Sequence, residues 1–80
     1  MARSTVTRHR NASIYTVETF DGSAMLALWR DALGWRGEIF YNGGSLECFG
    51  VYLLRTDAIA YALNVIDREE TMRAERAECA

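Results

Sequence analysis

The residues that could do chemistry in this chain are few and lie far apart in the sequence. The single histidine, His9, lies near the start of the chain and has no second histidine or nearby cysteine with which to build a metal cluster or a catalytic triad. We therefore interpret His9 as an ordinary exposed residue. The sequence predicts no catalytic residue, no metal ligand and no cofactor-binding residue.

The two cysteines have different contexts. Cys48 alternates with Leu46 and Gly50 in a run of strand-forming residues, a position typical of a small buried hydrophobic residue rather than a nucleophile. Cys79 is one residue from the end of the sequence and is expected to be exposed, so that oxidation would join two copies by an intermolecular disulfide. In a reducing compartment both are expected to be free thiols.

Paired carboxylates and a glycine pair are the other candidates for chemistry. Asp21 with Asp31, and Glu38 with Glu47, could serve as acid and base, but their sequence context indicates none of the burial that shifts a carboxyl pKa. We interpret them as surface charges. Gly43-Gly44 lacks the spacing and the strand-to-helix context of a nucleotide site, so we interpret it as a turn.

Aromatic and acidic residues remain, and both favour binding over catalysis. More large rings lie in and around residues 35–54 than a thin core encloses, and Trp or Tyr at a surface commonly anchors a protein interface. The alternatives are that the rings belong to the core and that the distal carboxylates form a solvated helix face. The predicted partner-binding residues are Trp35, Tyr41, Glu47, Asp67, Glu69, Glu70, Glu75 and Glu78.

The elements that position these residues can be read from turns and periodicity. Residues 35–54 predict a β-hairpin about Asn42-Gly43-Gly44-Ser45, and residues 12–20 predict a further strand. Residues 23–33 predict a short helix, because Met25, Leu28, Trp29 and Ala32 recur at helical spacing and Gly34 is well placed to end it.

A longer helix is predicted from Thr56 to near the C-terminus. Its apolar stripe consists of Ile59, Ala62, Leu63 and Ile66 and ends before Asp67. The predicted fold is therefore α+β in the order β-α-β-β-α, with a three-stranded antiparallel sheet, a short helix and a longer C-terminal helix.

Length and charge distribution predict one domain with a basic tip. Residues 1–11 have a formal charge of +3 and are expected to form a flexible basic arm. Residues 12–80 are expected to form a single α+β domain, in which 67–80 are a weakly packed acidic helix end supported by a Glu69–Arg73 pair.

The net charge of −2 argues against a general nucleic-acid binder, and no apolar run approaches the roughly 20 residues that cross a bilayer. The N-terminus lacks the apolar centre of a signal peptide, so we expect a cytoplasmic protein.

The chain as a whole is similar to one group of proteins. A lysine-free α+β chain with no catalytic motif, an Asn42-Gly43-Gly44-Ser45 hairpin and the acidic segment Asp67-Arg68-Glu69-Glu70 resembles the small anti-CRISPR proteins of phages and other mobile elements, in particular those directed at type I systems such as type I-C. The resemblance covers the whole chain in style and involves no family motif. It implies binding to the RNA-guided surveillance complex (Cascade) in a bacterial host cell and prevention of target-DNA binding, in some members as a DNA mimic.

We therefore expect a non-enzymatic inhibitor that binds a protein partner. It is expected to be a monomer or weak homodimer, to need no cofactor, and to bind neither DNA nor membrane. The first alternative is a small nucleic-acid-binding or regulatory module that uses the arginine-rich segment from Arg3 to Arg10. The second is a small enzyme, which the missing catalytic motifs disfavour.

Overall fold

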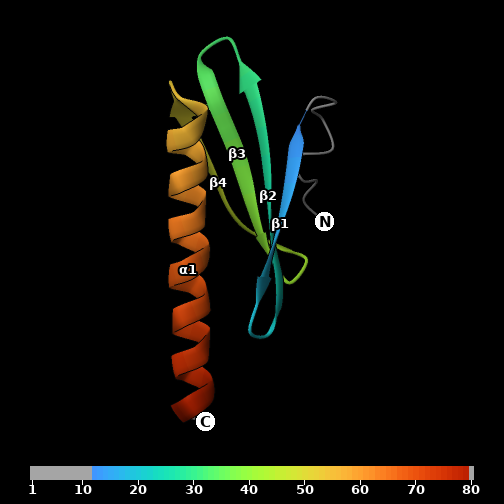
Figure 1. Cartoon of the computed structure of the whole chain (residues 1–80), viewed down its shortest axis with the longest axis vertical. Helices are drawn as coiled ribbons and strands as arrows, with labels where there is room; N and C mark the ends of the chain where they lie inside the picture. The colour runs from blue at the N-terminus through green and yellow to red at the C-terminus, as the bar shows by residue number, and fades with distance from the viewer. Residues whose placement is uncertain (1–11, 80) are drawn as a thin grey trace.

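The computed structural model describes residues 12–79, so the predicted arm at residues 1–11 lies outside the described residues. All the strands belong to one antiparallel sheet, in which each strand pairs with the next one along the chain. A long helix lies along one face of this sheet, and its C-terminal end extends beyond the strands (Figure 1). The elements are β1 (Ser13–Thr19), β2 (Gly22–Asp31), β3 (Gly34–Tyr41), β4 (Gly44–Tyr52) and α1 (Arg55–Cys79).

The predicted three-stranded sheet with two helices is wrong, because residues 22–31 form strand β2 and not a helix. β2 pairs with β1 on one side and β3 on the other. Ala24 and Leu26 pack in the cluster that α1 covers, whereas Ala27 and Trp29 pack in a second cluster with Phe40. A strand buried on both faces is a continuous apolar run, and such a run also matches helical spacing. Here two hydrogen-bonded neighbours and burial outweigh the helix propensity of Ala, Leu and Met.

The predicted hairpin between β3 and β4 is confirmed. Its two turn residues, Asn42 and Gly43, have φ angles of 49° and 84°, and positive φ at both positions suits a tight two-residue hairpin turn. Asn42 also joins this turn to β2, because its N–H donates to the Ser23 carbonyl (2.8 Å) and its Oδ1 accepts from the Ser23 N–H (3.0 Å). Gly22 permits this contact, since a Cβ there would lie 2.0 Å from Asn42 Oδ1.

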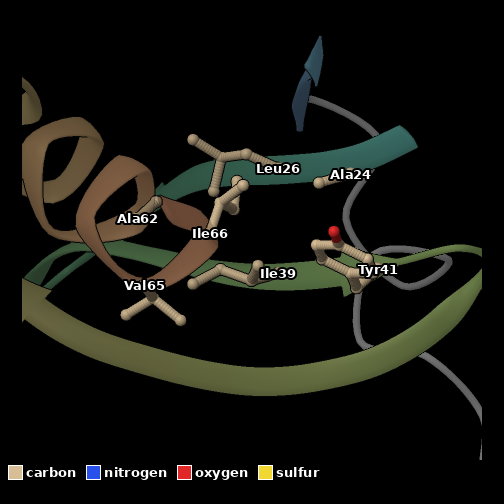
Figure 2. Packing of buried hydrophobic residues seen from close by; sticks show 7 residues of the cluster. All are labelled: Ala24, Leu26, Ile39, Tyr41, Ala62, Val65 and Ile66. Carbon is tan, nitrogen blue, oxygen red and sulfur yellow. The ribbon is translucent and has the colours of Figure 1, made fainter. Parts of the chain in front are cut away.

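The main core lies between the sheet and α1. Figure 2 shows Ala62, Val65 and Ile66 of α1 gathered over Leu26 and Ile39, which are partners on β2 and β3 and are at most 1% exposed. The predicted C-terminal helix is present, but its predicted apolar stripe is partly wrong. The buried residues are Ala58, Ala62, Val65 and Ile66.

The difference between the two stripes is a rotation of the helix about its axis. Leu63 is 46% exposed, and Ile59 is only partly buried. Ala58 and Ala62 are fully buried instead. Their small side chains let the helix backbone approach the sheet closely. If Ile59 and Leu63 pointed inward instead, their larger side chains would prevent this approach.

Candidate protein-binding end

Four large aliphatic side chains are exposed at the end of the molecule where α1 begins. Leu33 lies in the turn between β2 and β3, Val51 lies near the end of β4, and Leu53 and Leu54 connect β4 to α1. Their exposed fractions are 66%, 45%, 85% and 59%. Figure 1 shows the β2–β3 turn and the start of α1 at this same end. We refer to these four residues as the apolar end.

A close backbone contact brings the β2–β3 turn against β4. Gly34 has a φ of 144°, and a Cβ at this position would lie 2.6 Å from the Tyr52 carbonyl oxygen and 2.8 Å from Val51 Cγ2. Any larger residue would push the turn away from β4 and adopt a disfavoured backbone conformation. Gly34 therefore lets the turn that carries Leu33 lie close against the end of β4.

Asp31 holds the same turn in shape. One carboxylate oxygen, Oδ1, accepts hydrogen bonds from the N–H groups of Leu33 (2.8 Å) and Gly34 (3.2 Å), and the other pairs with Arg36. These bonds, with the Leu33 N–H as the largest cause, hold the pKa of Asp31 below its ordinary value. The turn that carries Leu33 is thus fixed by its own hydrogen bonds.

Arg55 borders the apolar end at the start of α1. Its guanidinium carbon lies 5.4 Å from the ring centroid of Tyr15 and 5.9 Å from that of Trp35. Both distances are within the range of cation–π attraction. Trp35, one of the predicted partner-binding residues, is therefore half-buried beside the apolar end.

The other predicted aromatic residue, Tyr41, lies towards the opposite end of the sheet and is 3% exposed. Its hydroxyl donates to Asp21 Oδ1 (2.7 Å), and the guanidinium carbon of Arg73 lies 4.1 Å from its ring centroid. The hydrogen bond from Tyr41 lowers the pKa of Asp21, and burial is the largest cause that raises the pKa of the Tyr41 hydroxyl. Tyr41 is thus part of a contact between the sheet and α1.

Two of the predicted acidic residues belong to this contact as well. Glu69 pairs with Arg73 at 2.7 Å, which confirms the predicted i,i+4 pair. Glu70 Oε2 accepts a hydrogen bond from the Phe20 N–H (2.7 Å) in the β1–β2 turn. The contacts of α1 with the sheet therefore extend to Arg73. We refer to Asp21, Tyr41, Glu69, Glu70 and Arg73 as the clasp.

The remaining predicted residues lie elsewhere. Glu47 on β4 accepts a hydrogen bond from the Tyr61 hydroxyl of α1. Asp67, Glu75 and Glu78 are exposed, and their spacing places them on one stripe of α1, which we refer to as the acidic stripe. Cys79 is an exposed free thiol. The structure therefore brings Tyr41, Glu69 and Glu70 together but does not unite the predicted set in one surface.

Two interpretations based on strand position are wrong. Cys48 is exposed, and it lines an open cleft of about 400 Å³ with Trp29 and Arg36. Glu38, its partner on β3, is 3% exposed and accepts a hydrogen bond from Ser45 Oγ (2.8 Å). The difference follows strand order: β3 is a central strand, whose side chains are flanked by those of β2 and β4, whereas β4 is an edge strand with a neighbouring strand on one side only.

Residues 12–79 contain no group of three or more His, Cys, Asp or Glu side chains placed to hold a metal ion. Over the same range, no helix has both the length and the apolar character needed to cross a membrane. Comparison with protein-family models, with curated proteins and with solved structures found no match.

The apolar end was not predicted from the sequence, because the predicted partner-binding residues are all aromatic or acidic. A signal was present: Leu33 and the pair Leu53-Leu54 occupy a turn and a connection, where polar residues, Gly and Pro are usual. Large aliphatic residues at such positions gain little from the core of their own chain. They are therefore candidates for burial against another molecule.

Proposed function

We propose that this protein is a non-enzymatic inhibitor that binds a protein partner through the apolar end. The observation that carries the proposal is the exposure of Leu33, Val51, Leu53 and Leu54 together at one end of the molecule. Single exposed apolar residues are ordinary on a monomer, but a group of them marks an interaction site. Leu33 projects from a turn and Leu53 and Leu54 from a connection, so an apolar pocket on the partner suits them.

The partner in this proposal is a type I CRISPR surveillance complex in the cytoplasm of a bacterial host. The resemblance to small anti-CRISPR proteins supports this choice, and loss of target-DNA binding is the expected effect. The acidic stripe supports a contribution from DNA mimicry, because Asp67, Glu75 and Glu78 are exposed between the middle of α1 and its C-terminal end. Carboxylates in this position would compete with DNA phosphates for basic side chains of the complex.

The test is co-elution with a purified type I-C surveillance complex on size exclusion under reducing conditions, followed by a target-DNA binding assay. The wild type should co-elute and abolish DNA binding. The double variant Leu53→Ser/Leu54→Ser should bind the complex at least about tenfold more weakly, since buried anchors at an interface each contribute about 1–2 kcal/mol or more. Leu63→Ser, a matched exposed leucine on α1, should bind like the wild type.

The acidic stripe can be tested separately from the apolar end. Replacing Asp67 with Asn and Glu75 and Glu78 with Gln should leave binding measurable and weaken the block on DNA binding. The clasp residues Glu69 and Glu70 should not be included, because their replacement would also loosen α1. Failure of the wild type to co-elute, or tight binding of the wild type to free duplex DNA at physiological salt, would refute the proposed function.

A further inference from the structure

The free edge of β1 is the longest regular strand edge in the described part of the chain. Within residues 12–79, β1 pairs only with β2, and all seven of its residues, Ser13–Thr19, pair in one continuous register. The other edge strand, β4, has two register shifts against β3. Bulges of this kind hinder the addition of a further strand, and β1 has none.

The side chains of β1 also offer little protection against pairing. None of its seven residues is buried, and Ile14 and Tyr15 are 50% and 36% exposed. The strand contains no Pro, Gly or Lys, and Glu18 is its only charged residue. Among the features that protect natural edge strands from pairing, β1 therefore carries only this one charge. A seven-residue strand of Ile, Tyr, Thr and Val is instead suited to a neighbour.

The two faces of β1 are identified by their contacts. Val17 packs against the core cluster under α1, and Arg55 at the start of α1 lies over the Tyr15 ring. Successive side chains alternate along a strand, so Ile14, Thr16 and Glu18 point to the opposite face of the sheet. Any strand added at this edge must match an apolar face on the α1 side and a mixed face on the other.

We propose that the β1 edge pairs with β1 of a second copy of this chain, antiparallel, about a two-fold axis at Thr16. This register uses all seven residues. Tyr15 then lies opposite Val17 of the second copy, Thr16 opposite Thr16, and Ile14 opposite Glu18. Aromatic with β-branched pairs and Thr–Thr pairs are favourable across strands, and no like charges face each other. An axis at Glu18, which would place Glu18 opposite Glu18, would lose this advantage.

The dimer is a continuous eight-stranded sheet with both α1 helices on one face. The two-fold axis is perpendicular to the sheet, so each copy presents its α1 side in the same direction. The proposal is independent of the surveillance complex, because β1 and the apolar end are different surfaces. It also differs from a Cys79 disulfide, since strand pairing persists in a reducing buffer.

Charge exchange at Thr16 tests the proposal. Thr16 is exposed, so its replacement should not affect the folded monomer. Wild type should show a concentration-dependent dimer by light scattering under reducing conditions. Thr16→Lys alone and Thr16→Glu alone should each raise the dimer dissociation constant at least about tenfold, because like charges would face each other at the axis. An equal mixture of the two variants should restore dimers.

A matched control is Thr71, which is exposed on α1. Thr71→Lys and Thr71→Glu, alone or mixed, should dimerise like the wild type. A wild type that is monomeric at every concentration would overturn the proposal. So would dimers that persist unchanged in both single Thr16 variants, because another surface would then hold them.

Disulfide trapping tests the register. In a Cys48→Ser/Cys79→Ser background, Thr16→Cys should form a covalent dimer on mild oxidation, because directly opposed residues in an antiparallel pair have Cα atoms about 4.5–5.5 Å apart, within disulfide range. Glu18→Cys in the same background should remain largely monomeric under denaturing conditions. Trapping by Glu18→Cys in preference to Thr16→Cys would refute the register.

Discussion

Replacing Ile66 and Leu63 one at a time with Ala tests how α1 is oriented on the sheet. Both residues belong to the apolar stripe predicted from periodicity, yet Ile66 is 3% exposed and Leu63 is 46% exposed. Ile66→Ala removes three buried carbons, which at about 0.8 kcal/mol each is about 2.4 kcal/mol. The cavity left among Leu26, Ile39 and Val65 raises the cost to about 3–5 kcal/mol.

This cost is a large part of the total stability. At about 0.05–0.15 kcal/mol per residue, 80 residues give about 4–12 kcal/mol. Since about 1 kcal/mol lowers the Tm of a domain this size by about 4–8 °C, Ile66→Ala should lower it by at least about 12 °C. Leu63→Ala should change the free energy of unfolding by less than about 0.5 kcal/mol, because Leu and Ala are both good helix formers and the site is exposed.

Urea unfolding followed by the fluorescence of Trp29 and Trp35 measures both variants on one scale. The urea midpoint should fall for Ile66→Ala. The slope of the unfolding free energy against urea concentration should not change, because unfolding exposes nearly the same surface area in both proteins. Equal losses for Ile66→Ala and Leu63→Ala would refute the orientation of α1 described above. Such equal losses would instead restore the stripe predicted from periodicity, because that stripe contains both residues.

The turns and the clasp give two further predictions. Gly22→Ala should cost about 1–3 kcal/mol by urea unfolding, because its φ is 150° and the new Cβ would meet Asn42 Oδ1. Gly44→Ala should cost much less, because its new Cβ would lie 3.7 Å from the Tyr41 carbonyl oxygen, an ordinary contact distance. Tyr41→Phe removes the hydrogen bond that lowers the pKa of Asp21. A lowered pKa contributes stability above pH about 3.8 that is lost as the pH falls through the folded value. The stability difference between Tyr41→Phe and wild type should therefore narrow in acid titrations, and a difference that widens below pH about 4 would contradict this assignment.

The parts of the fold predicted correctly are those with local signals. Asn42-Gly43 requires positive φ at two successive residues, which few other sequences supply, so the β3–β4 hairpin follows from a dipeptide. The 25 residues of α1 contain no Gly or Pro and keep a helical period in their first half. Neither feature depends on knowing what the segment packs against.

Strand β2 could not be identified in the same way, because its residues are apolar on both faces. Met25, Leu28 and Trp29 match helical spacing as well as they match a central strand, and only the neighbours on each side decide between them. The spacing of the turns carries a signal for this strand. Gly22, Gly34 and Gly44 each begin a strand, and turn signals at roughly 8–12-residue spacing are typical of an all-antiparallel meander.

The candidate site was harder to predict than the fold, because exposure depends on tertiary packing. Tyr is a residue type that often anchors interfaces, but Tyr41 is buried under the guanidinium of Arg73. Leu is a residue type typical of the core, but Leu53 is 85% exposed. Residue type alone gives the wrong environment for both.

The position of α1 after all four strands has a consequence for synthesis on the ribosome. Translation proceeds from the N-terminus at about 5–20 residues per second, so the 25 residues of α1 take roughly 1–5 s after β4 is complete. Until α1 emerges, the apolar face around Leu26 and Ile39 has no helix to cover it. Hairpins form in microseconds, so the nascent sheet can assemble and wait with this face exposed. Chaperones that bind nascent chains would therefore meet the protein as an uncovered sheet, and release would follow the docking of α1.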